Sequence, residues 1–245
     1  MSKVSWLLKA FNTFGFALIL GVSLTACGGG DKWKEEVLLH DGSKLIVERS
    51  QTYGGNHELG QGLPIKEHTI SFMLPRTNEA ITWKSEYGQE LGRTNFNLLA
   101  LDIVNGTPYI VAVPNLCLSY NKWGRPNPPY IFFKYTNQQW KQIPLSEFPV
   151  EIKEINLLIV TYGNNELDQL VKSGFVSSDK VEKFNNDGNM ATEYKSILRE
   201  PIKAGALGTD GSSVNCEAMV HYKCGWFGTK SDGTFDKKFG DTMCR

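Results

Sequence analysis

The chain has 245 residues, of which 41% are apolar, and it carries 26 basic and 26 acidic side chains. This apolar content is enough for a folded core, which excludes a disordered chain, and the length suits one domain or one domain with an appendage. The balanced charge provides no basic excess for phosphate groups, so the composition argues against nucleic-acid binding.

The N-terminal segment has the features of a secretory signal. Lys3 and Lys9 precede an apolar run over residues 14–24, and small residues then lead to Cys27. The run is too short for a helix that crosses about 30 Å of hydrocarbon, which needs roughly 20 residues. The pattern therefore predicts an exported protein with a signal peptide over residues 1–26.

The end of this segment, Leu24-Thr25-Ala26-Cys27, resembles the lipobox of bacterial lipoproteins. In that family the signal is cut before the cysteine, whose thiol and new amino group are then acylated. The resemblance implies that Cys27 is the first mature residue, the site of lipid attachment and the membrane anchor. In Gram-negative lipoproteins an aspartate after the cysteine causes retention at the inner membrane; Gly28 stands there instead, which implies the outer membrane. A plain secretory signal with an incidental cysteine is the alternative.

The body is expected to begin after a short lipidated tether over residues 27–34 and to form a β-rich domain over residues 35–203. Asp41-Gly42 supplies the tight turn of a first hairpin. Three further hairpins follow, because alternating or apolar runs flank segments with turn residues. The four strand pairs are 37–40 with 44–48, 69–74 with 80–85, 97–104 with 109–113, and 130–135 with 139–143.

The third pair is apolar at nearly every position, which predicts central strands covered on both faces. Eight strands in consecutive hairpins predict a mainly β (α+β) fold with an antiparallel meander, as a sheet, a sandwich or a small barrel. They are too few for a propeller, which needs at least about four blades of four strands.

The pattern changes after Pro149. Residues 154–160 are expected to form a further strand, and residues 165–172 and 177–184 two short helices. A last regular element is expected over residues 193–198. Residues 204–245 then form a linker and a cysteine-bearing tail, in which large apolar residues are sparse.

Four cysteines remain once Cys27 is assigned to lipid, and in an oxidising compartment they predict up to two disulfides. The preferred pairing joins two of the three tail cysteines and links the third to Cys117. A free buried thiol is the alternative for Cys117, between two leucines. The four candidates are Cys117, Cys216, Cys224 and Cys244.

The tail also offers a weaker metal hypothesis. Cys216, His221 and Cys224, with Cys244 downstream, could close a structural zinc site. Thiols of an exported protein tend to oxidise first, so no metal site is predicted. No cofactor and no catalytic residue are predicted either. His57 and Glu58, in a glycine-rich loop, could form an acid–base pair, but such a loop is more often a mobile connection.

The loop over residues 120–130 contains the residues most typical of a binding surface. Its prolines restrict the chain and so lower the entropy cost of presenting Trp123 and Arg125, whose residue types are enriched at binding hot spots. A rigid crossover, in which Trp123 packs on the edge of the sheet, is the alternative.

The segment Asn115-Leu116-Cys117-Leu118-Ser119-Tyr120-Asn121-Lys122-Trp123-Gly124-Arg125-Pro126 resembles uncharacterised proteobacterial lipoproteins. The resemblance covers much of residues 33–200, carries no activity, and leaves out the tail. The sequence as a whole favours a membrane-anchored envelope lipoprotein with a non-catalytic binding or structural role, whose partner is an envelope protein, peptide or glycan. A membrane-tethered hydrolase acting on envelope polymers is the alternative, with a site of distant acids or of His57 and Glu58.

Overall fold

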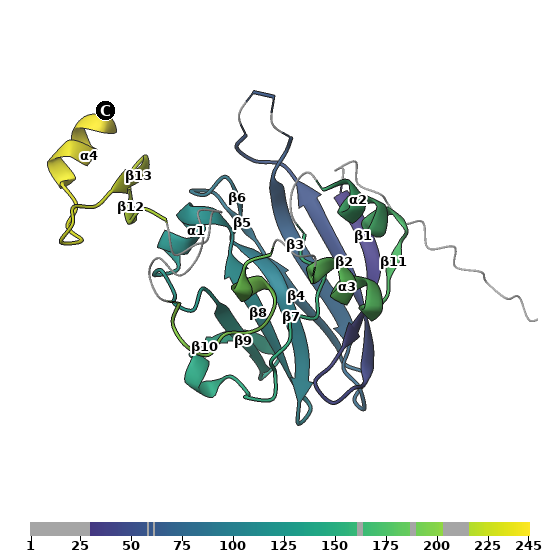
Figure 1. The fold of residues 1–245 in the computed structure, drawn as a ribbon. Helices are drawn as coiled ribbons and strands as arrows, with labels where there is room; N and C mark the ends of the chain where they lie inside the picture. The colour runs from purple at the N-terminus through teal and green to yellow at the C-terminus, as the bar shows by residue number, and fades with distance from the viewer. Residues whose placement is uncertain (1–29, 58, 61, 161–163, 187–189, 203–215) are drawn as a thin grey trace, which may run out of the picture.

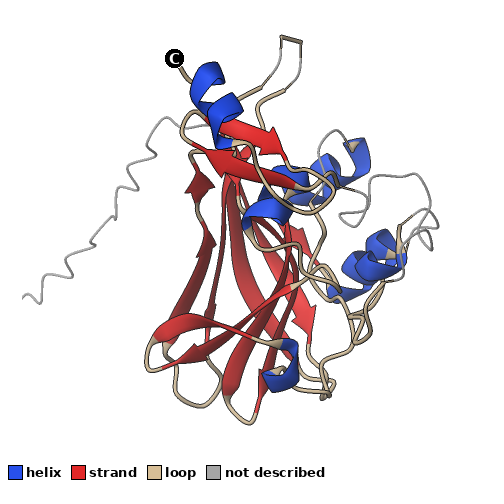
Figure 2. Ribbon diagram, turned by 90° about the vertical axis from the view of Figure 1, so that its left-hand side faces the viewer, coloured by secondary structure: helices blue, strands red, loops and turns tan. Residues whose placement is uncertain are grey.

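Two antiparallel sheets pack face to face in the computed structural model, with helices and long connections on one side (Figures 1 and 2). The structure describes residues 30–57, 59–60, 62–160, 164–186, 190–202 and 216–245. The predicted mainly β fold, with hairpins, helices and a cysteine-bearing C-terminal region, is confirmed. The signal peptide, Cys27, Glu58 and most of the linker lie outside the described residues.

The first sheet is a meander of four strands with one added at its edge. The meander consists of β1 (Gly30–Leu38), β2 (Lys44–Tyr53), β3 (Ile65–Met73) and β4 (Ala80–Ser85). The short strand β11 (Phe175–Val176) pairs in parallel with β1. Because β1 already begins at Gly30, the expectation that residues up to 34 form a tether is wrong: residues 30–34 pair with β2 as part of the sheet.

The second sheet has the order β10-β9-β8-β7, which is again a meander. Its strands are β7 (Phe96–Val104), β8 (Thr107–Pro114), β9 (Ile131–Thr136) and β10 (Gln139–Ile143). A two-residue ladder, β5 (Tyr87–Gly88) with β6 (Arg93–Thr94), connects the two sheets along the chain.

The main core lies between the sheets. Alternate residues of the first sheet, such as Val47 and Ile70, meet Ile110 and Leu98 of the second. The prediction that β7 and β8 are covered on both faces is confirmed, since a second cluster joins their outer face to residues 148–159. β7 is nevertheless an edge strand and not a central one.

Residues 154–160 do not form the expected strand; within them only Glu154 makes an isolated bridge, to Ser196. Side chains replace a regular ladder here. The Asn156 amide accepts a hydrogen bond from the Leu101 backbone N–H at 3.0 Å and donates one to the Leu101 carbonyl at 2.9 Å. The backbone N–H of Leu157 donates to the carbonyl of Leu99.

The two predicted helices are confirmed as α2 (Asn165–Lys172) and α3 (Ser178–Asn185), which pack beside β1. Asn164 caps α2, because its side chain accepts hydrogen bonds from the first turn. The last expected element is a single 3₁₀ turn, η2 (Thr192–Tyr194). Another such turn, η1 (Leu145–Glu147), follows β10.

The loop expected over residues 120–130 overlaps the end of a helix, α1 (Leu116–Lys122). The C-terminal unit contains a hairpin of β12 (Met219–Tyr222) and β13 (Gly225–Gly228), followed by α4 (Lys237–Met243). None of the helices in the described part of the chain is both long enough and apolar enough to cross a membrane.

A buried ion pair joins β1 to β2. Arg49 donates to the Glu35 carboxylate at 3.1 Å, and both side chains are almost fully buried. Trp33 Nε1 donates to the same carboxylate at 2.9 Å, and the Leu158 backbone N–H donates to it at 2.6 Å. Burial lowers the pKa of Arg49, although the charge of Glu35 opposes this. Glu35 thereby ties β1 to β2 and to the segment that follows β10.

Candidate functional site

Trp123 lies at the C-terminal end of α1 and packs against the main core. Its ring centroid is 4.6 Å from that of Phe96, and its Nε1 donates to the side chain of Asn95 at 3.4 Å. The indole is therefore only partly exposed. This position matches the packing alternative described for the loop, while a role in binding a partner stays a prediction.

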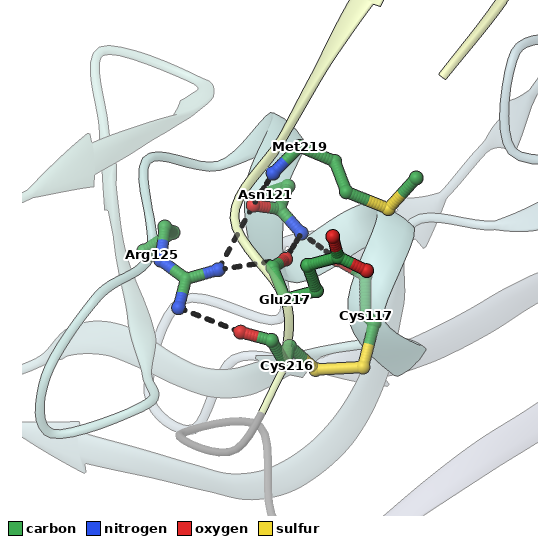
Figure 3. The surroundings of a disulfide bond; sticks show 6 residues. All are labelled: Cys117, Asn121, Arg125, Cys216, Glu217 and Met219. Carbon is green, nitrogen blue, oxygen red and sulfur yellow. Dashed lines mark hydrogen bonds between the residues drawn. A yellow bond between two sulfur atoms is a disulfide. The ribbon is translucent and has the colours of Figure 1, made fainter. Parts of the chain in front are cut away.

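Arg125 contacts the C-terminal segment of the same chain (Figure 3). Its guanidinium donates to the backbone carbonyls of Cys216 at 2.8 Å and Glu217 at 3.1 Å. Asn121 accepts a further bond from Arg125 and one from the backbone N–H of Met219, both at 2.9 Å. Arg125 and Asn121 thus recognise backbone groups of an extended segment, and this segment belongs to the protein itself.

All four candidate cysteines form disulfides in the preferred arrangement. Cys117 pairs with Cys216, which joins α1 to the C-terminal unit, and Cys224 pairs with Cys244 within that unit. Neither the free-thiol alternative for Cys117 nor the zinc alternative fits, because each sulfur is bonded to another sulfur and no thiolate is left to bind metal.

A cleft of about 690 Å³ lies between the β1–β2 turn, β7, residues 151–156 and α3. Its lining includes the buried side chains of Leu39 and Ile155. Its polar walls come from segments far apart in the sequence. The charged side chains that line it are His40, Asp102, Glu151, Lys153, Glu154, Asp179, Glu182 and Lys195.

His40 and Asp102 form the most defined polar pair of this cleft. Oδ1 of Asp102 lies 2.6 Å from Nδ1 of His40, and Oδ2 accepts the backbone N–H of His40 at 3.0 Å. Asp102 also accepts the Ile103 backbone N–H, and its side chain is only 4% exposed, whereas 23% of the His40 side chain is exposed. A buried carboxylate therefore fixes an imidazole that solvent can reach.

The electrostatic surroundings of His40 favour its protonated form. The hydrogen bond to Asp102 raises the pKa of His40 above its ordinary value, the nearby charges of Asp102, Asp41 and Glu151 act in the same direction, and partial burial opposes them. Nδ1 is committed to Asp102, and within the described part of the chain Nε2 has no hydrogen-bond partner. This nitrogen can donate to a ligand when protonated and accept when neutral.

A second polar group stands at the start of α3, on the wall of the cleft. Ser178 Oγ and Lys44 Nζ each donate to Glu36 at 2.8 Å. The bond from Lys44, followed by that from Ser178, lowers the pKa of Glu36. These contacts fix the first turn of α3 against β1 and so hold one wall of the cleft in place.

The carboxylates exceed the amines around the rim of the cleft. Besides the His40–Asp102 pair, four exposed acids and two exposed lysines line it. Exposed charges of one sign raise the local concentration of a ligand of the opposite sign. The cleft is therefore suited to a ligand with a positive charge and hydrogen-bonding groups.

Sequence reasoning treated His40 as an ordinary strand residue and did not single out Asp102. One signal was available: Asp102 is the one acid in the apolar run of residues 97–104. The other histidines lie elsewhere. His57 is exposed, with Nδ1 3.2 Å from the carbonyl of Gly55, while His68 is buried among the strands, where desolvation lowers its pKa to about 3.

No protein-family model, curated protein or solved structure matches this chain. Its resemblance to lipoproteins stays a prediction from the sequence. The geometry and charge of the cleft are therefore the features that point to a function.

Proposed function

We propose that the protein is a lipid-anchored protein of the cell envelope, held at the outer membrane through Cys27, which binds an amine-bearing ligand without chemical turnover. The anchor is supported by the signal-like N-terminus and the lipobox pattern. The ligand site is supported by one observation above all: four exposed acids against two exposed lysines line the 690 Å³ cleft. Basic peptides of the envelope are the ligand class that this charge favours.

The charge of the ligand provides the sharpest test of this site. A short lysine-rich peptide should bind the purified protein, and the same peptide with acetylated lysines should bind several-fold more weakly, because acetylation removes the charge. Added salt should weaken binding of the first peptide, since salt screens exposed charges. Equal affinity for both peptides would argue against the proposal.

Variants locate the binding within the protein. Replacing Glu151 and Glu182 by glutamine should weaken binding of the lysine-rich peptide, with a loss of about 0.2–1 kcal/mol for each exposed charge. Glu48→Gln, on an exposed position of β2 outside this cleft, is the matched control and should leave affinity unchanged. The same loss in the control would place the interaction elsewhere.

A second function, hydrolysis of an envelope polymer, is favoured by the orientation of His40. When Nδ1–H donates to Asp102, Nε2 of the neutral ring is the acceptor and can take a proton from water. For this function His40→Ala should abolish product release from purified envelope glycans while the protein still binds them. Product release that persists in His40→Ala would exclude His40 as the base.

A further inference from the structure

The start of β1 determines which end of the sandwich is closest to the anchor. Gly30 is the first residue of β1 and pairs with Thr52, near the end of β2. Cys27 precedes Gly30 by three residues, which span about 10 Å at most. An acylated Cys27 therefore leaves this end of the sheet next to the lipid surface; this step rests on the anchoring proposed above.

The connection between β2 and β3 projects at this same end. Both ribbon views show it standing beyond the ends of the strands (Figures 1 and 2). Its base is closed by a hydrogen bond from the Gly54 N–H to the Pro64 carbonyl, and the Asn56 N–H donates to the Gly92 carbonyl. Gly55 permits this approach, since its φ is +104° and a Cβ there would overlap with Gly92.

Two leucines of this connection are exposed to solvent. Leu59 is the most exposed of the large apolar side chains that the structure describes, at 105%, and Leu63 is 47% exposed. Single exposed leucines are common on soluble proteins. These two differ from the others in their position, because the connection that carries them follows β2 directly, at the end of the sheet where Gly30 begins β1.

We propose that Leu59 and Leu63 enter the lipid surface in which Cys27 is anchored, so that the sandwich stands end-on on the membrane. Apolar side chains at such an interface are buried about 5–10 Å deep, between headgroups and acyl chains. The lipid is the occupant because the anchor places it within reach of this end, and both leucines are exposed to solvent.

The same orientation places the ligand cleft away from the membrane. His40 follows the far end of β1, and the nine residues of that strand span about 30 Å. The acidic rim then faces the aqueous compartment, where a soluble basic ligand can reach it. Membrane contact and ligand binding thus use opposite ends of one strand.

The test uses the mature lipidated protein in vesicles of phosphatidylethanolamine and phosphatidylglycerol. An environment-sensitive fluorophore is attached to Leu59→Cys or, as control, to Val150→Cys. Val150 is also exposed, at 72%, and follows η1, far along the chain from the connection that carries the leucines. The introduced thiol reacts alone, because Cys27 carries lipid and the other cysteines form disulfides.

The fluorophore at position 59 should shift to the blue and be quenched several-fold more strongly by brominated acyl chains than the fluorophore at position 150. If the protein carries the acyl label and remains with the vesicles but both positions are quenched equally, the end-on contact is overturned and the anchoring is not. Protein that lacks the acyl label and does not remain with vesicles would overturn the anchoring, and this inference with it.

Discussion

The carboxylate of Asp102 contacts His40 through both of its oxygens: Oδ1 lies 2.6 Å from the ring Nδ1, and Oδ2 lies 3.0 Å from the backbone nitrogen. The two residues are separated by 62 positions in the chain, and the contact joins the β1–β2 turn to the second sheet. Both the position of the imidazole and its protonation therefore depend on one buried side chain.

Asp102→Asn should lower the pKa of His40 toward its ordinary value, because the amide cannot stabilise the imidazolium as a carboxylate does. NMR titration of the His40 ring measures this change. Asp41→Asn is the control: Asp41 is close enough to raise the pKa of His40 by its charge, but its own hydrogen bonds go to Ser43. We expect a larger decrease for Asp102→Asn, and similar decreases would contradict the role of the direct bond.

The same pair should make stability depend on pH. The folded-state pKa of His40 is raised above its ordinary value of 6.5, so the stabilisation is fully present below that value and is lost as the pH rises through the folded pKa. In His40→Gln, whose side chain does not titrate, this loss of stability with rising pH should be absent. Urea unfolding of both proteins at a series of pH values measures the free energy of unfolding. If this free energy changes equally with pH in both proteins above pH 6.5, the contribution of His40 is disproved.

Glu35→Gln should lower the free energy of unfolding by about 3–5 kcal/mol, since it leaves the Arg49 guanidinium buried without a charged partner. Glu48→Gln, one strand away and exposed, should change the free energy of unfolding by less than about 0.5 kcal/mol. Adding Arg49→Met to Glu35→Gln should recover part of the loss, because both buried charges are then gone. Urea unfolding compares the variants. If Glu35→Gln alone is as stable as Glu48→Gln, the buried charge of Glu35 does not stabilise the fold.

Arg125→Ala should loosen the C-terminal segment, because it removes the bonds to the Cys216 and Glu217 carbonyls and one support of Asn121. The amide of Met219, which donates to Asn121, should then exchange with deuterium faster. Arg76→Ala, in the turn between β3 and β4, provides the control. Unchanged exchange at Met219 would show that the disulfide to Cys117 is sufficient to hold the segment.

Cys27→Ser should abolish acyl labelling in cells and leave an uncleaved precursor, because this thiol is the lipid acceptor in the proposed function. Metabolic labelling with a fatty acid, together with the mass of the purified protein, measures both effects. Cys117→Ser is the matched control and should keep its label. Labelling that persists in Cys27→Ser at the normal mature mass would rule out this anchor.

The four hairpins could be predicted because their signals are local. Asp41-Gly42 and Asn105-Gly106 mark tight turns, and the side-chain pattern on either side indicates strands. The arrangement of the hairpins in two sheets could not be derived in this way, nor could the parallel addition of β11 to β1, because both depend on contacts between distant segments. α1 was missed because it is one short helix in a segment rich in turn residues.

The candidate site was harder to predict than the fold. An acid in the apolar run of β7 was visible as an anomaly, but nothing local shows that its partner is His40. The cleft also needs α3 and residues 151–156, whose positions follow from packing. Arg125 was selected for its residue type, and only the folded chain reveals that it contacts backbone carbonyls of the C-terminal segment.

Asn156 has a consequence for self-association. An edge strand with free backbone groups can add a strand from another chain and so start aggregation. On β7, the amide of Asn156 occupies both backbone groups of Leu101, and Leu157 occupies the carbonyl of Leu99. A single carboxamide thus occupies the place of a neighbouring strand and blocks strand addition at an apolar edge.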